Sequence, residues 1–182
     1  SGGIPLKRSI GLDASAEEVW LVLSDVQSVV GCVPGASLDG PSDGELLAGR
    51  CAVSAGPMQA TFRGTALLRL DETNRRGRLV GQGRDRLTRS ELTGSLDFAL
   101  YEEDAGRARL DLAMHYRLKG PLAQFSRPAL VEEIADQVLA EVTANIARRA
   151  KGGEVMPGRS LSGVTLLGRI VARLFNRLLQ MR

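Results

Sequence analysis

The stretch MQATFRGTALLRL, residues 58–70, alternates between two kinds of side chain and decides how the chain folds. One kind is small or apolar and shares one face of an extended strand: Met58, Ala60, Phe62, Gly64, Ala66, Leu68 and Leu70. The other kind is polar: Gln59, Thr61, Arg63, Thr65 and Arg69. A period of two with one apolar face is typical of an antiparallel strand whose other face meets water. The stretch therefore predicts a strand that covers a core on one side only.

The same period continues on both sides of this stretch. It is present before it in LAGRCAVSA (47–55) and after it in RLVGQGRD (78–85), ELTGSLDFALY (91–101) and RARLDLAMHYRLK (107–119). Short turn sequences, DETNRRG (71–77) and EEDAG (102–106), separate these segments. IPLKRSIGL (4–12) adds a further strand near the N-terminus. Strands joined by such short turns predict an antiparallel sheet.

Helical segments precede and follow the predicted strands. Ser15 is the predicted N-cap of a short helix in SAEEVWLVLSD (15–25), and a second short helix is expected over residues 26–30, ending at Gly31. The Gly- and Pro-rich segment CVPGASLDGPSDGE (32–45) predicts a loop. A long helix is expected from about Pro128 to Arg149, after a separate turn at 122–125. Its apolar stripe consists of Leu130, Val131, Ile134, Ala135, Val138, Leu139, Val142 and Ile146.

This order of elements predicts an α+β fold in which a curved antiparallel sheet wraps around one long C-terminal helix. The enclosed face of the sheet carries five glycines among its larger residues: Gly49, Gly64, Gly81, Gly83 and Gly94. Glycines inside strands allow sharp bends or leave space. Aromatic residues make up only 4% of the chain. We therefore expect an apolar cavity between the sheet and the long helix.

Charge is distributed unevenly along the chain. The net charge is +3, but no acidic residue follows Glu154, whereas five arginines do. Without those five, 19 basic residues face 21 acidic ones. This balance argues against a nucleic-acid-binding body and for a C-terminal segment that meets an anionic surface. We expect a domain at 4–150, a flexible linker at 151–160 and an amphipathic helix at 161–182.

The segment LSGVTLLGRIVARLFNRLLQMR (161–182) places leucines and arginines on opposite sides of a helix. Burying Arg173 in mid-bilayer would cost about 2.5–3.5 kcal/mol, so we expect the helix to lie in the membrane interface and not to span it. Docking on its own domain or on a second copy is the alternative. The predicted membrane-binding residues are Leu167, Arg169, Ile170, Val171, Arg173, Leu174, Phe175, Arg177 and Leu178. With no signal sequence at the N-terminus, we expect the protein on the cytoplasmic face.

Residues that would carry catalysis or hold a metal are scarce. His115 is the only histidine, and the alternation places it on the wet face of its strand. A Ser–His or Cys–His nucleophile is therefore not expected. Cys32 and Cys51 have no metal-ligand or redox spacing, and we expect them to be reduced. The acidic residues are scattered, so we expect no enzyme and no metal.

Four segments resemble the family of the carbon monoxide dehydrogenase subunit CoxG, within the START/Bet v 1-like helix-grip superfamily. They are CVPG (32–35), GPMQATFRG (56–64), LVGQGRD (79–85) and LVEEIADQVLAEVTANI (130–146). The resemblance covers residues 4–149. Two features depart from the family: Val138 and Leu139 stand where aromatic residues are usual, and Pro128 interrupts the approach to the helix.

The resemblance implies a non-catalytic accessory protein that recruits a carbon monoxide dehydrogenase-type molybdenum hydroxylase to the cytoplasmic membrane. It also implies a pocket for an apolar small molecule, with no covalently bound cofactor. We expect an isoprenoid quinone or another lipid in it, because the enzyme must deliver electrons to an acceptor dissolved in lipid. The alternatives are a recruitment or assembly factor with a vestigial pocket, and a cyclase- or hydrolase-like enzyme of the same superfamily.

Candidate ligand-binding residues follow from the apolar faces of the strands and the long helix. They are Phe62, Leu96, Phe98, Leu112, Met114, Tyr116, Ile134 and Val138. Tyr116, if buried, needs a hydrogen-bond partner that a polar ligand head could supply. The loop Cys32-Val33-Pro34-Gly35 is either a lid at the pocket mouth or an ordinary turn.

Overall fold

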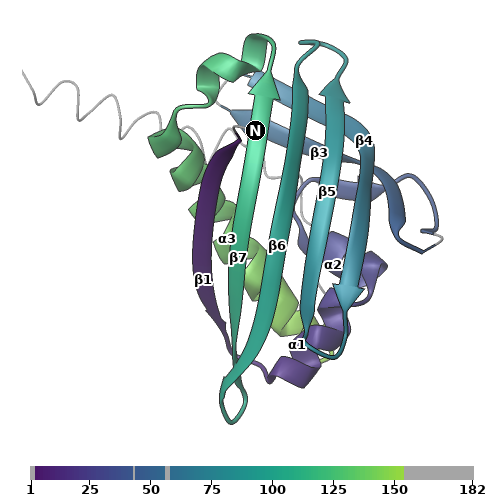
Figure 1. The fold of residues 1–182 in the computed structure, drawn as a ribbon, viewed down its shortest axis with the longest axis vertical. Coiled ribbons are helices and arrows are strands. Elements are labelled where there is room, and N and C mark those ends of the chain that lie inside the picture. The colour runs from purple at the N-terminus through teal and green to yellow at the C-terminus, as the bar shows by residue number, and fades with distance from the viewer. Residues whose placement is uncertain (1–2, 43, 56–57, 154–182) are drawn as a thin grey trace, which may run out of the picture.

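The structure is a computed structural model that describes residues 3–42, 44–55 and 58–153. Seven antiparallel strands form one sheet in the order β1-β7-β6-β5-β4-β3-β2 (Figure 1). The strands are β1 (Ile4–Leu12), β2 (Ala36–Leu38), β3 (Leu46–Ala55), β4 (Met58–Asp71), β5 (Arg76–Asp85), β6 (Glu91–Asp104) and β7 (Arg107–Lys119). The helices are α1 (Ala16–Leu23), α2 (Val26–Cys32), the 3-10 helix η1 (Pro121–Phe125) and α3 (Pro128–Ala150).

The helices begin where their capping residues predict. Ser15 caps α1, and Glu18 completes a capping box by accepting from the Ser15 backbone N–H. Asp25 caps α2, which ends at Cys32, one residue beyond the predicted end. The predicted turn before the long helix is η1, and Pro128 begins α3 because a proline at the first helical position loses no backbone hydrogen bond.

The loop predicted at 32–45 contains a strand that the sequence analysis missed. β2 pairs with β3 through Ala36 opposite Cys51 and Leu38 opposite Gly49. Gly35, at φ +76°, leads into it, and its carbonyl accepts from the backbone N–H of Ala52 at 2.8 Å. Gly and Pro mark turns, so a strand of three residues between them gave no periodic signal.

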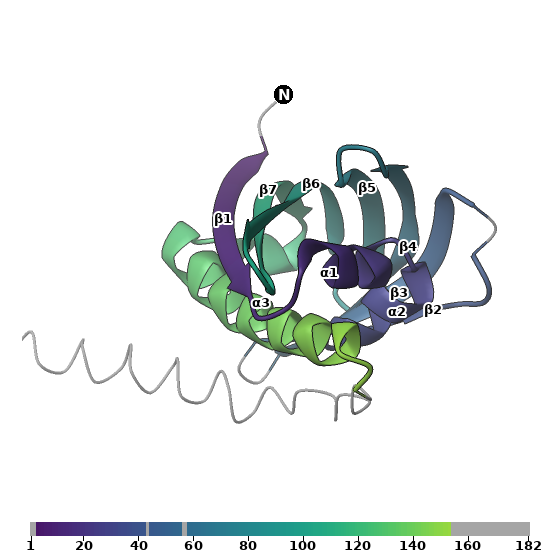
Figure 2. The ribbon, with the colours of Figure 1, turned by 90° about the horizontal axis from the view of Figure 1, so that it is seen from below.

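The sheet curves around one side of the molecule, and α3 runs across its open side with α1 and α2 beside it (Figure 2). An ion pair between Arg8 of β1 and Asp136 joins α3 to the first strand. A curved antiparallel sheet closed by a C-terminal helix is the helix-grip fold, so the predicted fold class is confirmed. The cause is the alternation itself, because a sheet with one apolar face must bury that face against another layer.

The main hydrophobic core lies where α1 and the end of α3 meet the sheet. It includes Leu12, Val19, Trp20, Leu110 and Ile146. A smaller cluster of Ala60, Phe62 and Leu122 forms separately, with Leu92, Leu118 and Phe125 packed against it. We call this the satellite cluster. Two separate clusters mean that the enclosed face is not filled evenly from end to end.

The predicted linker at 151–160 and the predicted amphipathic helix at 161–182 lie largely or wholly outside the described residues. In the part of the chain that the structure describes, no helix is long and apolar enough to cross a membrane.

Candidate ligand-binding cavity

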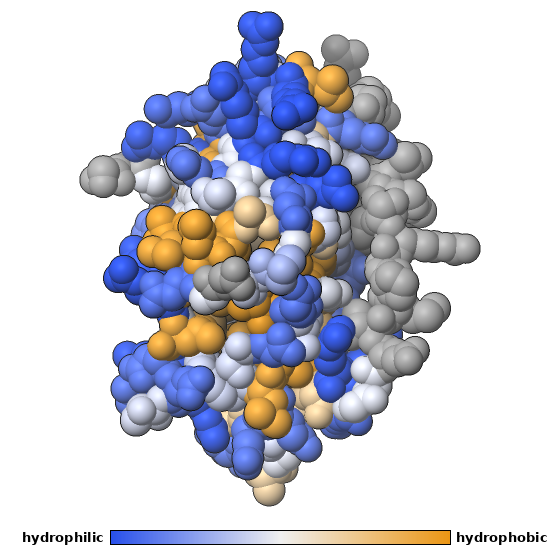
Figure 3. Space-filling model, turned by 90° about the vertical axis from the view of Figure 1, so that its right-hand side faces the viewer, coloured by the Kyte–Doolittle hydropathy of each residue, from blue (hydrophilic) through white to orange (hydrophobic). Residues whose placement is uncertain are grey.

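An apolar cavity of about 390 Å³ lies against the inner face of the sheet. Its walls come from β2 to β7, with Val30 of α2 on the helical side. Cavities that bind small molecules have volumes of about 300–1,000 Å³ and mostly apolar walls. The volume is therefore sufficient for a small apolar ligand or for part of a larger one. On the face where β2, β3 and β4 lie, hydrophobic side chains gather across the middle (Figure 3).

All five glycines predicted on the enclosed face line this cavity: Gly49, Gly64, Gly81, Gly83 and Gly94. At Gly64 a side chain is impossible, because a Cβ there would lie 1.8 Å from the carbonyl oxygen of Gln82 on the next strand. At Gly81 and Gly83 the nearest atom to an added Cβ is another Cβ at 3.2 Å. The glycines thus allow close strand contact and leave the interior without side chains.

Tyr116 places a polar group in these apolar walls. It lines the cavity, is only 9% exposed, and its hydroxyl has no hydrogen-bond partner. Burial raises the pKa of Tyr116 above its ordinary value, so the hydroxyl stays protonated and can donate. An unpaired buried hydroxyl costs about 1–3 kcal/mol. A ligand with a hydrogen-bond acceptor at this position would remove that cost.

Four of the predicted ligand-binding residues line the cavity: Phe62, Leu96, Met114 and Tyr116. Phe98 and Leu112 face the same side of the sheet but pack against the main core instead. The ring of Phe98 lies 6.5 Å from that of Trp20, measured between centroids. Alternation places all six residues on one face, whereas their position along the strand decides between core and cavity.

Ile134 and Val138 of α3 are half-buried and are not among the residues that line the cavity. No α3 residue of the described chain lines it. The cavity was expected between the sheet and the long helix, and its position differs from that expectation. The reason is that α3 packs against β1, α1 and α2, whereas the cavity extends over β3 to β6.

The loop at 32–35 borders the cavity without lining it. Cys32 is fully buried in the main core, and burial raises the pKa of its thiol. Val33, Pro34 and Gly35 are also absent from the lining, but the residues on both sides of the loop, Val30 and Ala36, belong to it. Its role as a lid stays a prediction.

The predicted membrane-binding residues, Leu167 to Leu178, lie outside the described residues. The lining residues that the sequence analysis did not assign to the ligand include Leu38, Leu47, Ala66, Leu79 and Leu92. Ala66 was predicted on the correct face by alternation. Leu38 had no such signal, because it belongs to the missed strand β2.

The cavity contains few groups that could carry acid–base chemistry. His115 is exposed on the outer face of β7, as predicted. The one buried carboxylate among the described residues, Asp85, accepts from the backbone N–H of Thr61 at 3.0 Å and from Thr88 at 2.7 Å. These bonds, led by that from the Thr88 hydroxyl, hold the pKa of Asp85 below its ordinary value. Within residues 3–153, no three metal-ligating side chains gather. Binding, not proton transfer, is what these walls support.

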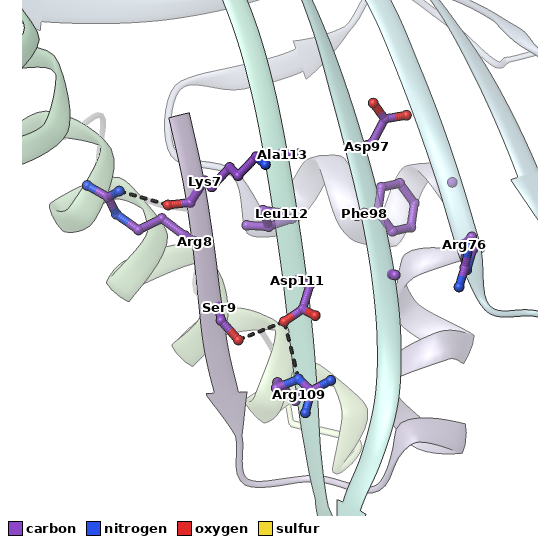
Figure 4. Close-up of a pocket in the computed structure, with 12 residues that line it drawn as sticks. Lys7, Arg8, Ser9, Arg76, Asp97, Phe98, Arg109, Asp111, Leu112 and Ala113 are labelled. Carbon is purple, nitrogen blue, oxygen red and sulfur yellow. Dashed lines mark hydrogen bonds and ion pairs between the residues drawn. The ribbon is translucent and has the colours of Figure 1, made fainter. Parts of the chain in front are cut away.

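A second, wider groove of about 920 Å³ lies on the outer face of β1, β7, β6 and β5 (Figure 4). Its polar groups are largely bonded to one another. Asp111 accepts from the Ser9 hydroxyl at 2.7 Å and from Arg109 at 3.2 Å, and Asp97 pairs with Arg78 at 2.9 Å. A groove whose carboxylates are already paired and which is open to water is a weaker candidate than the cavity.

Comparison with protein families places the chain. The family model described as CoxG, a subunit of carbon monoxide dehydrogenase, matches residues 9–151. The chain belongs to the CoxG family. A search of curated proteins finds no significant match. The resemblance carried by the four segments, CVPG among them, is thereby confirmed.

Solved structures share the fold of this CoxG family member at low identity. A conserved protein from Geobacillus kaustophilus has a TM-score of 0.71 and 13% identity, covering 82% of this chain and 96% of that one. A START superfamily protein from Mycobacterium smegmatis has a TM-score of 0.54 and 13% identity, covering 83% and 99%. The ZhuI aromatase/cyclase from Streptomyces has a TM-score of 0.53 and 19% identity, covering 84% and 100%. These likenesses show a START-like fold, which enzymes and non-enzymes share. Family and fold together indicate an accessory protein that binds hydrophobic ligands.

Proposed function

We propose that this protein is a non-catalytic accessory protein of an aerobic carbon monoxide dehydrogenase, a molybdenum hydroxylase. It binds an apolar ligand in its cavity and recruits the enzyme to the inner face of the cytoplasmic membrane. Electrons from the enzyme then enter the respiratory chain there. The family supports the partner, and the cavity supports the ligand.

The observation that carries the proposal is an apolar cavity with a single buried unpaired hydroxyl in its wall, that of Tyr116. Such a site favours a ligand with a long apolar part and one hydrogen-bond acceptor. An isoprenoid quinone has both, because its prenyl tail is apolar and its ring carbonyl accepts. The ring carbonyl would accept from Tyr116, and the tail would lie against the glycine-lined wall.

Membrane recruitment is supported by the C-terminal sequence. The last 22 residues combine leucines with arginines and contain no acidic residue. Such a segment is typical of helices that lie in the interface of an anionic membrane. A protein held there would meet both the soluble enzyme and the lipid-dissolved acceptor.

Titration of the purified, delipidated protein with quinones of increasing prenyl length tests the ligand. Each buried CH₂ contributes about 0.8 kcal/mol, so affinity should rise with tail length until the cavity is full. Native mass spectrometry should show a stoichiometry of one ligand per chain. Equal, millimolar binding at all lengths would instead support a recruitment factor with a vestigial pocket.

A further inference from the structure

One end of the molecule is basic and the other is acidic, along the direction of the strands. Segments 84–91 and 117–127 meet at the upper end in Figure 1 and hold six basic and two acidic residues. Segments 13–18 and 102–107 lie at the lower end and hold six acidic and one basic residue. We call the upper set, residues 84–91 with 117–127, the basic tip. An anionic surface attracts the basic tip and repels the opposite end, so it orients the molecule.

The apex of the basic tip carries an exposed leucine. Leu87 lies in the turn between β5 and β6 and is 88% exposed, more than any other large hydrophobic residue in the described chain. Arg84, Arg86 and Arg89 around it are all exposed. A single exposed leucine is ordinary by itself. Here, however, it stands at the end of the long axis and is surrounded by cations.

The turn that presents Leu87 is held in shape by the hydrogen bonds of Asp85. The Asp85 carboxylate accepts from the backbone N–H and the hydroxyl of Thr88, both at 2.7 Å. The Asp85 backbone N–H donates to the carbonyl of Ser90 at 3.0 Å, and the Ser90 hydroxyl accepts from the backbone N–H of Leu122 in η1 at 3.0 Å. The turn is therefore joined to η1, and its leucine is presented without a further ordering cost on binding.

We propose that the basic tip docks on an anionic phospholipid membrane, with Leu87 inserted among the lipids and the surrounding arginines at the headgroups. An apolar residue below a ring of cations matches the layered chemistry of a membrane interface. A folded protein partner would need a pocket for Leu87 within an acidic surface. The proposal rests on the proposed membrane function, but it assigns a contact on the folded domain that is separate from residues 161–182.

Docking by the basic tip would bring the cavity to the lipid. The satellite cluster lies directly behind the tip, since Leu122 is bonded to Ser90 and Phe62 pairs with Asp85. Phe62 and Leu92 also line the cavity. A ligand drawn from the membrane would then have only this small cluster to pass.

Binding of the full chain to vesicles of phosphatidylcholine mixed with phosphatidylglycerol tests the proposal. Each arginine near such a surface is worth about a fivefold change in partitioning, and a partly buried leucine contributes about as much. We expect Arg86→Gln and Leu87→Ser each to weaken binding about fivefold. Matched changes at the acidic end, Arg107→Gln and Leu21→Ser, should leave it unchanged, although Leu21 is also exposed, at 68%.

Insertion is measured with lipids brominated in their acyl chains. Leu87→Trp fluorescence should be quenched on vesicle binding, whereas Leu21→Trp should not be. If the chain binds vesicles but Leu87→Trp is not quenched and the tip variants bind normally, the tip proposal is wrong and recruitment by residues 161–182 stands. If Leu174→Glu with Leu178→Glu retains tip-dependent binding, the tip proposal stands without that segment. A chain that binds no vesicles at all overturns both, and leaves an acidic protein as the partner of the tip.

Discussion

The side-chain amide of Asn145 in α3 donates a hydrogen bond of 3.0 Å to the carbonyl oxygen of Cys32, the last residue of α2. Arg148 Nη2 in turn donates to the Asn145 carbonyl oxygen at 2.6 Å. Asn145 is one of the few buried polar residues of the described chain. The bond fixes the C-terminal part of α3 against the segment that leads to the cavity-bordering loop.

Asn145→Ala should lower the free energy of unfolding by about 1–3 kcal/mol, because it leaves the Cys32 carbonyl buried without this donor. Urea denaturation would measure the change. Thr143→Ala is the matched control, since the Thr143 hydroxyl bonds only to carbonyls of its own helix. Equal losses in the two variants would contradict a specific role for the contact between α3 and α2.

Tyr116→Phe should have opposite effects on stability and on ligand binding. Removing an unpaired buried hydroxyl should leave the ligand-free protein as stable as before or more stable. If the hydroxyl donates to a quinone carbonyl, its loss should weaken quinone binding by about 0.5–1.5 kcal/mol. Thermal denaturation and quinone titration measure the two effects. Unchanged affinity would show that the ligand makes no bond to Tyr116.

Filling the cavity should exclude the ligand without unfolding the domain. Ala66→Leu adds apolar volume to the cavity wall, whereas Ala48→Leu adds the same side chain at an exposed position of β3. We expect at least a tenfold loss of quinone affinity in Ala66→Leu, equivalent to about 1.4 kcal/mol, and no loss in Ala48→Leu. A crystal structure of Ala66→Leu with quinone bound in the same place would refute this use of the cavity.

Acid should loosen the β5–β6 turn through Asp85. Its pKa is lowered in the folded state, chiefly by the bond from the Thr88 hydroxyl, so its charged form adds stability above the unfolded pKa of about 3.9. That contribution is lost as the pH falls below this value and through the folded pKa. Asp85→Asn should therefore lose less stability between about pH 5 and pH 2 than the native protein does. Asp39→Asn, on an exposed position after β2, is the matched control.

The regular parts of the fold could be predicted from periodicity. Alternation identified the strands and their inner faces, and the stripe from Leu130 to Ile146 identified α3. β2 escaped because three residues are too short for a periodic signal. Its partner is set by the tertiary fold, where Gly35 brings the chain beside Ala52.

The cavity could be predicted only in part. Glycines on an apolar face predict space, and all five line it. Which apolar residues border that space depends on where the helices cross the sheet, and no local pattern reports this. Phe98 and Leu112 therefore belong to the core near Trp20, although they share a face with Leu96 and Met114.

The last prediction concerns residues 161–182, whose sequence combines nine leucine, isoleucine, valine or phenylalanine positions with regularly spaced arginines from Val164 to Leu179. Each fully buried side chain of this kind contributes about 1.5–3 kcal/mol, or about half of that at an interface, whereas each arginine near an anionic leaflet adds about 1 kcal/mol. The apolar contribution should dominate. Leu174→Glu with Leu178→Glu should then release the protein from anionic vesicles at any salt concentration.

The same two charges on the polar face separate insertion from simple attraction. Asn176→Glu with Gln180→Glu changes the net charge equally but removes no apolar residue, so binding should weaken only modestly. Arg173→Gln should weaken binding and reduce its salt dependence, because salt screens only the electrostatic part. Flotation of each variant with vesicles at low and high salt measures these effects. If both glutamate pairs release the protein to the same extent and low salt rescues both, the segment binds by charge alone, and interfacial burial of its leucines is refuted.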